Sequence, residues 1–154
     1  MAKEIERKFL VRDDSFKIGA ISEKHIIQGY LSTEVRATIR VRIVDDSAVL
    51  TVKGKNDGVV RDEWEYPIPV DDAREMLQRL STGTLIDKVR YIVEYEGKRW
   101  EVDSFRSPLP GLVVAEIELS SPEEEFAIPP FIGEEVTGDP AYYNSTIARM
   151  GMNG

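Results

Sequence analysis

The sequence predicts a mainly β protein of the α+β class, built from antiparallel strands with a few flanking helices. Apolar and charged residues alternate along several short segments, as in residues 37–43, and a period of two is typical of strands with two unlike faces. Turn sequences separate these segments, and Asn56-Asp57-Gly58 is a hairpin signal. Apolar residues at helical spacing occur in few places, which limits the expected helices to the edges of the sheet.

Five strands are predicted in the first half of the chain. In the first strand Glu4, Glu6 and Lys8 share one face, because successive side chains of a strand point to opposite faces. The fifth strand ends at Pro67, since proline cannot donate a backbone hydrogen bond. The predicted ranges are residues 4–10, 26–31, 37–43, 48–55 and 61–66.

The second half adds a helix, three strands and a helical end. Asp72 and Glu75 resemble a capping box, and apolar residues follow at helical spacing until Gly83. The three strands that follow, a short helix and a last helix are predicted at residues 88–95, 99–105, 113–119, 121–125 and 139–150. The expected number of strands is therefore eight.

Charged pairs of one sign recur two residues apart on one face of seven of these strands. The acidic pairs are Glu4/Glu6, Glu63/Glu65, Glu101/Asp103 and Glu116/Glu118. The basic pairs are Arg40/Arg42, Lys53/Lys55 and Lys88/Arg90, and Lys8 and Arg61 lie on the same faces. An ordinary solvent-exposed sheet face also alternates apolar and polar residues. Such faces carry more serine, threonine and glutamine, however, and mix their signs.

These sixteen charges predict a water-filled binding cavity. A dry core would cost several kcal/mol of desolvation for each ion, which would exceed the roughly 5–15 kcal/mol of net stability that a domain has. Carboxylates are suited to a hard divalent cation such as Mg²⁺, and arginine forks match the oxygens of phosphate groups. The pattern therefore predicts a cavity for a polyanion and a metal.

Composition limits the other possibilities. The 154 residues fit a single domain, residues 1–154, with 42% apolar and 31% charged side chains. The net charge of −8 argues against a nucleic-acid surface. The absence of cysteine excludes disulfides and thiol catalysis. No apolar run is long enough for a membrane span, and Met1 leads directly into a strand without a signal peptide, so a cytoplasmic location is expected. The aromatic outer faces suit helices or a second subunit, which makes a homodimer possible.

The charged motifs, taken in order, resemble those of the CYTH superfamily, the triphosphate tunnel metalloenzymes. The segment Glu4-Ile5-Glu6-Arg7-Lys8 is similar to the N-terminal Glu-x-Glu-x-Lys signature of that superfamily. The motifs that follow are Arg40-x-Arg42, Lys53-Gly54-Lys55, Arg61-x-Glu63-x-Glu65, Lys88-x-Arg90, Glu101-x-Asp103 and Glu116-x-Glu118. The similarity extends from Glu4 to the terminal helix near Asn144, and it is closest to the short bacterial inorganic triphosphatases.

The resemblance implies a closed eight-stranded antiparallel β-barrel whose tunnel binds a triphosphate and one or two divalent cations, Mg²⁺ or Mn²⁺. The substrate-binding residues that it implies are Lys8, Arg40, Arg42, Lys53, Lys55, Arg61 and Arg90. The metal ligands that it implies are Glu4, Glu6, Glu116 and Glu118, followed by Glu101 and Asp103. Glu63 and Glu65 are weaker candidates, which could instead orient neighbouring bases.

The resemblance also implies an activity. Tyr30 and Lys88 match a proposed catalytic pair of the short bacterial triphosphatases, although Tyr30 could equally be a tyrosine that only packs in the barrel. The expected reaction is metal-dependent hydrolysis of inorganic tripolyphosphate to pyrophosphate and phosphate. The alternatives are a class IV adenylyl cyclase, a thiamine triphosphatase and a non-catalytic polyphosphate-binding module. A compact chain without an insertion for a nucleoside pocket favours hydrolysis.

Overall fold

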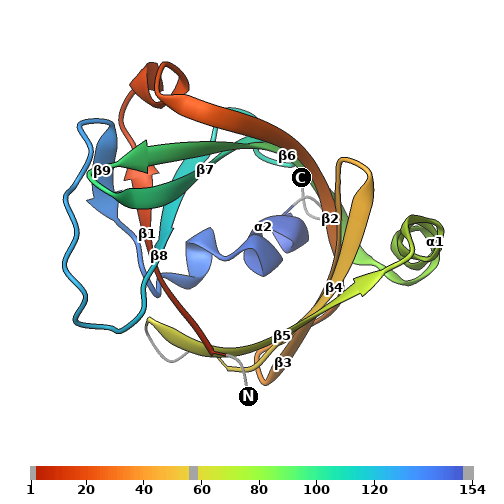
Figure 1. Cartoon of the computed structure of the whole chain (residues 1–154). Helices are drawn as coiled ribbons and strands as arrows, with labels where there is room; N and C mark the ends of the chain where they lie inside the picture. Colours follow the sequence, from red (N-terminus) through yellow and green to blue (C-terminus); the bar gives the residue numbers. More distant parts are fainter. Residues whose placement is uncertain (1–2, 56–58, 151–154) are drawn as a thin grey trace.

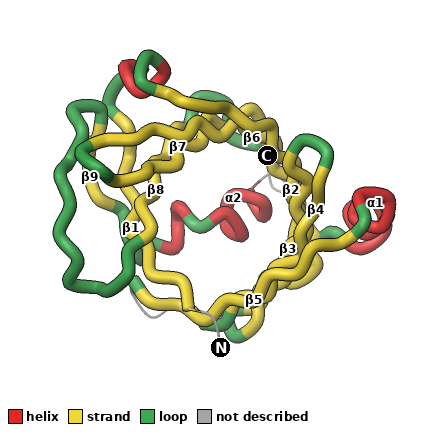
Figure 2. The backbone as a smooth tube through the Cα atoms, in the orientation of Figure 1, coloured by secondary structure: helices red, strands yellow, loops and turns green. Residues whose placement is uncertain are grey.

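Eight antiparallel strands close into a barrel in this computed structural model, which describes residues 3–55 and 59–150 (Figures 1 and 2). The barrel strands are β1 (Lys3–Val11), β2 (Ala20–Glu34), β3 (Ala37–Val44), β4 (Ser47–Lys53), β5 (Val60–Ile68), β6 (Thr82–Tyr95), β7 (Lys98–Ser107) and β8 (Val113–Glu118). The closed eight-stranded barrel is therefore confirmed. The predicted turn at Asn56-Asp57-Gly58 lies outside the described residues.

Strand β1 closes the barrel by changing partners along its length. Its first residues, Lys3 to Ile5, pair with β5, and its middle residues, Glu6 to Leu10, pair with β8. Around the ring the order is β5-β4-β3-β2-β6-β7-β8-β1. A short ninth strand, β9 (Ile132–Glu135), pairs with the end of β1. Its four residues have no charge alternation, which explains why the sequence did not predict it.

The helices differ from the predicted ones at their boundaries. Helix α1 (Val70–Leu80) begins after Pro69 with no side-chain cap, so the capping box predicted at Asp72 is wrong, and Asp71 and Asp72 instead lie in the first turn. There they interact favourably with the helix dipole. Residues 121–125 form turns rather than the predicted helix. The expected last helix is divided into a 3₁₀ turn, η2 (Pro140–Tyr142), and a short helix, α2 (Asn144–Met150).

Apolar side chains cover the outside of the barrel in two separate clusters. On one side Trp100 and Phe9 pack against Phe126 and Phe131 of the chain that follows β8, together with Phe16 of the 3₁₀ turn η1 (Asp14–Lys17). On the other side α1 packs on β2, β3 and β4 through a small cluster that comprises Val41, Ala48, Ala73 and Leu77. These clusters leave the inner face free for polar residues.

Close packing at Gly29 brings α1 onto β2. A Cβ atom at this position would lie 2.7 Å from Leu85 Cδ2 and 2.8 Å from Leu77 Cδ2, so any larger residue would displace both leucines. Helix α2 lies within the ring of strands in Figures 1 and 2 and packs on β6 and β2. Its Ile147 and Ala148 are fully buried. Within the described residues no helix is both long and apolar enough to cross a bilayer.

Candidate active site

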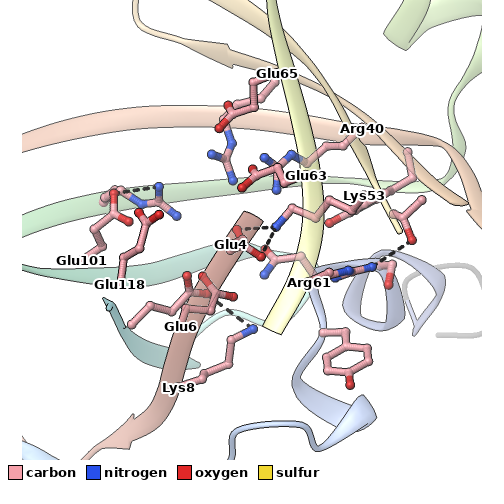
Figure 3. A pocket seen from close by; sticks show the side chains of 18 of the residues that line it. Glu4, Glu6, Lys8, Arg40, Lys53, Arg61, Glu63, Glu65, Glu101 and Glu118 are labelled. Carbon is pink, nitrogen blue, oxygen red and sulfur yellow. Dashed lines mark hydrogen bonds and ion pairs between the residues drawn. The ribbon is translucent and has the colours of Figure 1, made fainter. Parts of the chain in front are cut away.

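A polar cavity of about 310 Å³ occupies the inside of the barrel. Its charged lining comes from alternate positions of the strands, and Figure 3 shows these side chains converging on the same space. The acids are Glu4, Glu6, Glu63, Glu65, Glu101, Glu116 and Glu118, and the bases are Lys8, Arg40, Arg42, Lys53, Arg61, Lys88 and Arg90. The strand period of two therefore brings together most of the predicted charges.

Three arginines on the β3 and β5 side of the cavity are held by neutral oxygen atoms. Arg40 donates to Thr51 Oγ1 at 3.2 Å, and Arg42 donates to Gln28 Oε1 at 2.8 Å. Arg61 donates to the backbone oxygen of Gly54 at 2.8 Å and to a threonine hydroxyl. Among the described residues none of these arginines forms an ion pair, so their positive charges are not neutralised.

The charges of Arg40 and Arg42 are also close to each other. Burial, together with Arg40 and Arg90, lowers the pKa of Arg42 to about 9. The buried Nε of Arg40 has no hydrogen-bond partner among the described residues. An anion bound between these two side chains would relieve their repulsion and complete their hydrogen bonding.

The part of the cavity that is formed by β1, β7 and β8 has a surplus of carboxylates. Glu6 lies directly across from Glu118, and Glu101 lies directly across from Glu116. Burial, with Glu116 and Glu4, raises the pKa of Glu6 well above its usual value. Burial, with Glu4 and Glu101, likewise raises the pKa of Glu118. Burial is the larger cause of both shifts, and the repulsion by neighbouring carboxylates adds to it.

Strand β6 differs from both sides, because its two cations are paired with carboxylates. Arg90 forms a two-pronged contact with Asp103 at 2.8 and 2.9 Å and a third bond with Glu101 at 3.0 Å. Lys88 lies 2.7 Å from Asp103. Burial alone would raise the pKa of Asp103, but Arg90 and Lys88 outweigh it and lower that pKa. Burial lowers the pKa of Lys88 to about 7 despite this carboxylate.

Two predicted site residues do not line the cavity. Asp103 shares the inner face, but both of its oxygens are engaged by Arg90 and Lys88, and 3% of its surface is exposed. It therefore anchors two cations and offers no free oxygen to a metal. Lys55 is exposed, because strand β4 ends at Lys53 and the alternation does not continue through Gly54. The structure places this lysine outside the lining.

The predicted catalytic pair lies in the cavity without direct contact between its members. Tyr30 and Lys88 both line the cavity, from the neighbouring strands β2 and β6. In the described residues Lys88 bonds to Asp103 and Asn144 rather than to Tyr30. The charged neighbours of the Tyr30 phenol are Lys8 and Arg42.

The sequence did not predict the uncharged residues of the site. Gln28 and Thr51 hold arginines, and Asn144 accepts a hydrogen bond from Lys88 Nζ at 2.9 Å. Gln28 lies two residues before Tyr30 on the same face, and this spacing was the available signal. Further lining residues come from the segment that leads into α2, namely Thr137, Tyr143, Asn144 and Ser145.

The carboxylate side fits a divalent cation, although it does not complete a cation site by itself. Among the described residues no three acidic side chains converge closely enough to enclose a metal ion. Mg²⁺ needs only one or two protein carboxylates, because it retains water and binds phosphate oxygens of a substrate. Glu6 and Glu118 face each other, and neither has an ion-pair partner among the described residues. The repulsion of Glu6 by Glu116 and Glu4, and of Glu118 by Glu4 and Glu101, is the observation that a cation would explain.

Comparison with known proteins agrees with this site. A CYTH domain matches residues 2–146. The chain belongs to the CYTH family. An inorganic triphosphatase from Acetivibrio thermocellus is 45% identical over 151 residues, which cover 97% of this chain and 95% of that protein. An inorganic triphosphatase from Nitrosomonas europaea is 36% identical, with 94% and 96% covered. A crystal structure of an inorganic triphosphatase superposes with a TM-score of 0.67 and 34% identity, covering 95% of this CYTH chain and 97% of the other.

Proposed function

We propose that this protein is a divalent-cation-dependent triphosphatase that hydrolyses inorganic tripolyphosphate to pyrophosphate and phosphate. The observation that carries the proposal is that one cavity contains both arginines without an ion pair among the described residues, on β3 and β5, and a surplus of carboxylates, on β1, β7 and β8. The first group is its arginine side and the second its carboxylate side. A linear triphosphate is a polyanion and a hard cation prefers oxygen ligands, so each side has a matching partner. Similarity to two inorganic triphosphatases over nearly the whole chain supports the same reaction.

The arginine side binds the phosphate groups. Arg40, Arg42 and Arg61 are each oriented by a neutral oxygen, which leaves donors of the planar guanidinium for phosphate oxygens. Lys53 and Lys8 add ammonium groups, and both are shared with carboxylates of the lining, Glu4 and Glu116. Arg90 completes the predicted set from β6, where it is held by two carboxylates.

The carboxylate side binds the cation, either Mg²⁺ or Mn²⁺. Glu6 and Glu118 are the foremost ligands, because they face each other without an ion pair, and Glu4 and Glu116 are close to them. Glu101 lies on the same side, and Glu63 and Glu65 line the cavity from β5. A cation held by Glu6 and Glu118 would supply Lewis-acid polarisation of the substrate phosphate.

The residues of the chain then position the reactants and neutralise charge. In the reaction, the oxygen of a water molecule bonds to the terminal phosphorus and the bridging P–O bond breaks, so that pyrophosphate leaves. The arginine side neutralises the negative charge that develops on this leaving group. Tyr30, which lines the cavity and interacts electrostatically with Lys8 and Arg42, orients the attacking water through its hydroxyl. Lys88, held by Asp103, contributes an ammonium group to the same space.

The lining favours an inorganic substrate over a nucleotide. A cyclase needs a pocket for adenine and ribose, and binding sites for organic groups are predominantly lined by apolar and aromatic side chains. In the described cavity the aromatic residues are Tyr30 and Tyr143, and the remaining lining is charged or polar. The same observation opposes thiamine triphosphate. A module that only binds polyphosphate would not need the carboxylate side.

A product assay tests the proposal. Tripolyphosphate, ATP and thiamine triphosphate are each incubated with the protein and either Mg²⁺ or Mn²⁺. Release of one phosphate from tripolyphosphate, faster than from the other two substrates, is the expected result. Cyclic AMP and pyrophosphate from ATP would show a cyclase instead. Binding of tripolyphosphate without turnover would show a binding module.

Three further expectations accompany this function. We infer that residues 1–154 fold as one domain, that the protein is cytoplasmic and that it can form a homodimer, and each of these stays a prediction. Sedimentation of the purified protein measures the oligomeric state, and a single cooperative thermal transition that coincides by two probes is the expected result for one domain.

A further inference from the structure

We propose that Gln28 and Asn144 are positioning residues, a pair of neutral amides that orient Arg42 and Lys88 towards the substrate phosphates. The proposal rests on the proposed triphosphatase function, because it concerns how two cations of that site are held. Neither amide carries a charge, so the charge alternation along the strands gives no indication of this role.

A line of hydrogen bonds connects the four side chains. Arg42 Nε donates to Gln28 Oε1 at 2.8 Å, and Gln28 Nε2 donates to Asn144 Oδ1 at 3.0 Å. The same Asn144 oxygen accepts from Lys88 Nζ at 2.9 Å. Gln28 and Lys88 are both fully buried, so water does not substitute for these partners.

The direction of each bond follows from the two cations at the ends of the line. Arginine and lysine can only donate hydrogen bonds. Gln28 must therefore present its oxygen to Arg42, which leaves its NH₂ group facing Asn144. Asn144 must then present its oxygen, which accepts from Gln28 and Lys88 together. One arrangement of the two amides makes all three bonds of the line, and the orientation of Arg42 is thereby linked to that of Lys88.

The neutrality of the amides matters as much as their hydrogen bonds. A carboxylate at position 28 could accept the same bond from Arg42, but it would neutralise the guanidinium that is to bind phosphate. It would also place an acceptor against Asn144 Oδ1, where a donor is required. Gln28 orients Arg42 and leaves its positive charge available for a polyanion.

The line also links the site to the C-terminal helix. Gln28 belongs to β2, whereas Asn144 is the first residue of α2, 116 residues further along the chain. Helix α2 is seated by Ile147 and Ala148, which are buried in a cluster with Tyr30 and Ile86. Lys88 and Arg42 therefore acquire their full set of partners only when α2 occupies its place in the barrel.

Steady-state kinetics on two substitutions test the proposal. Gln28→Met keeps the length of the side chain and removes both bonds, and Asn144→Ala removes the shared acceptor. A bond to a charged group is worth about 1.5–3 kcal/mol, so each variant should lower kcat/KM for tripolyphosphate by about 10- to 100-fold. Ile92→Ala is the control, because Ile92 is buried outside the network and lines no part of the cavity. It should lower Tm and leave kcat/KM unchanged well below Tm.

The variant Gln28→Glu tests whether Gln28 orients Arg42 or only fills space. This variant retains an acceptor for Arg42, so its Tm should equal or exceed that of Gln28→Met, yet its KM for tripolyphosphate should rise by about 10-fold. If the amide only fills space, Gln28→Glu will keep the wild-type KM, and this outcome would overturn the proposal. The double variant Gln28→Met/Asn144→Ala should lose no more activity than the worse single variant, whereas a full product of the two losses would show independent roles and also overturn it.

Failure of the proposed function is recognised separately. The wild-type protein is assayed first, and an inactive wild type that binds tripolyphosphate would refute the triphosphatase but not the positioning role. In that case the Kd for tripolyphosphate with Mg²⁺ is measured by calorimetry in each variant and in the wild type. The ratios of these Kd values then replace the ratios of kcat/KM. Unchanged Kd values in Gln28→Met and Asn144→Ala would then refute the positioning role, and a wild type without turnover or binding would refute both.

Discussion

The cations of this barrel are held in two different ways. The difference distinguishes cations that are available to a ligand from cations that mainly stabilise the fold. Arg40, Arg42 and Arg61 are oriented by a hydroxyl, an amide and a backbone oxygen, which are neutral. Arg90 is instead held by Asp103 and a second carboxylate, and 9% of its surface is exposed. Both kinds of contact fix a guanidinium group, but the neutral kind leaves more of the positive charge for a ligand.

The comparison shows that charged side chains without an ion-pair partner identify the binding surface. The total number of charged side chains does not. The described cavity has seven acids and seven bases in its lining, which sum to zero. These charges are nevertheless unevenly distributed, because β3 presents two arginines without an ion pair among the described residues, whereas β1, β7 and β8 together present five carboxylates and one lysine. A triphosphate with its cation has the complementary distribution of charge.

Removal of divalent cations should produce the largest effect and should affect the two sides unequally. With a chelator, turnover of tripolyphosphate should fall by about 10²–10³-fold or more, because the polarisation of the phosphorus atom is lost. Binding should weaken far less, since the arginine side remains. Kinetics with and without chelator, and calorimetry under the same conditions, measure the two quantities. Turnover that persists in the chelator after dialysis would show that no cation is required.

Arg90→Ala should have the largest effect on stability. It leaves Asp103, buried and charged, with Lys88 as its remaining partner, and breaking a buried ion pair costs about 3–5 kcal/mol. Tm should fall by about 10 °C, from roughly 2–4 °C for each kcal/mol in a chain of this size. A thermal melt measures the change. Arg90→Ala/Asp103→Asn is the control and should recover part of the loss, because the buried carboxylate is removed and Lys88, whose pKa is about 7, can lose its proton. A Tm within 2 °C of wild type in Arg90→Ala would contradict a structural role.

Arg40→Ala should have the opposite profile. Its partner, Thr51, is neutral, so no buried carboxylate is left unpaired. The loss of stability should therefore be about 1.5–3 kcal/mol, below that of Arg90→Ala, whereas KM for tripolyphosphate should rise by about 10- to 100-fold. Arg40→Lys keeps the charge without the fork and should recover only part of the affinity. Kinetics and a thermal melt on the same samples give both numbers. A variant that loses stability and keeps its KM would place Arg40 with Arg90 instead.

Lys88 should make substrate binding depend on pH near neutrality. Its pKa is about 7 in the folded, ligand-free protein and about 10.4 in an unfolded chain, so between these values the unfolded state binds more protons. The stability of the ligand-free protein should therefore rise with pH over this window, by at most about 1.4 kcal/mol per pH unit. A bound polyanion favours the ammonium form, so binding at pH 8 should take up close to one proton.

Calorimetry at pH 8 in buffers of different ionisation enthalpy measures this uptake. Tripolyphosphate itself titrates in the same range, so Lys88→Met serves as the reference. The wild type should take up more protons than the variant. Equal uptake by the two proteins would mean that Lys88 is already protonated before the substrate binds.

Lys55→Ala should have the smallest effect. Lys55 is exposed beyond the end of β4, whereas Lys53, two residues earlier, lies in the lining and contacts Glu4. Lys55→Ala should keep kcat and KM within about two-fold, as is usual for exposed residues away from a site. Lys53→Ala is the matched variant and should raise KM. An increase in KM that is equal in both variants would show that Lys55 also reaches the substrate.

The alternation of charged and apolar residues predicted most of the strands and most of the cavity lining from the sequence alone. Charged residues at every second position marked seven of the eight predicted strands, and the charged face was predicted to line a cavity, because a strand has only two faces. The alternation predicted that Lys55 lies on the charged face, but β4 ends at Lys53 and Lys55 is exposed. The alternation did not predict β9, because the residues of this strand have no period of two.

Only the tertiary structure decided which charges are free. Asp103 and Glu118 have the same place in the pattern, yet Asp103 is enclosed by Arg90 and Lys88, while Glu118 faces Glu6. Pairing across the barrel depends on the register between strands and on α2, which brings Asn144 to Lys88 from the far end of the chain. Periodicity is a local property of the chain, whereas the surplus charge of a cavity arises from contacts between distant segments, and a single strand cannot determine them.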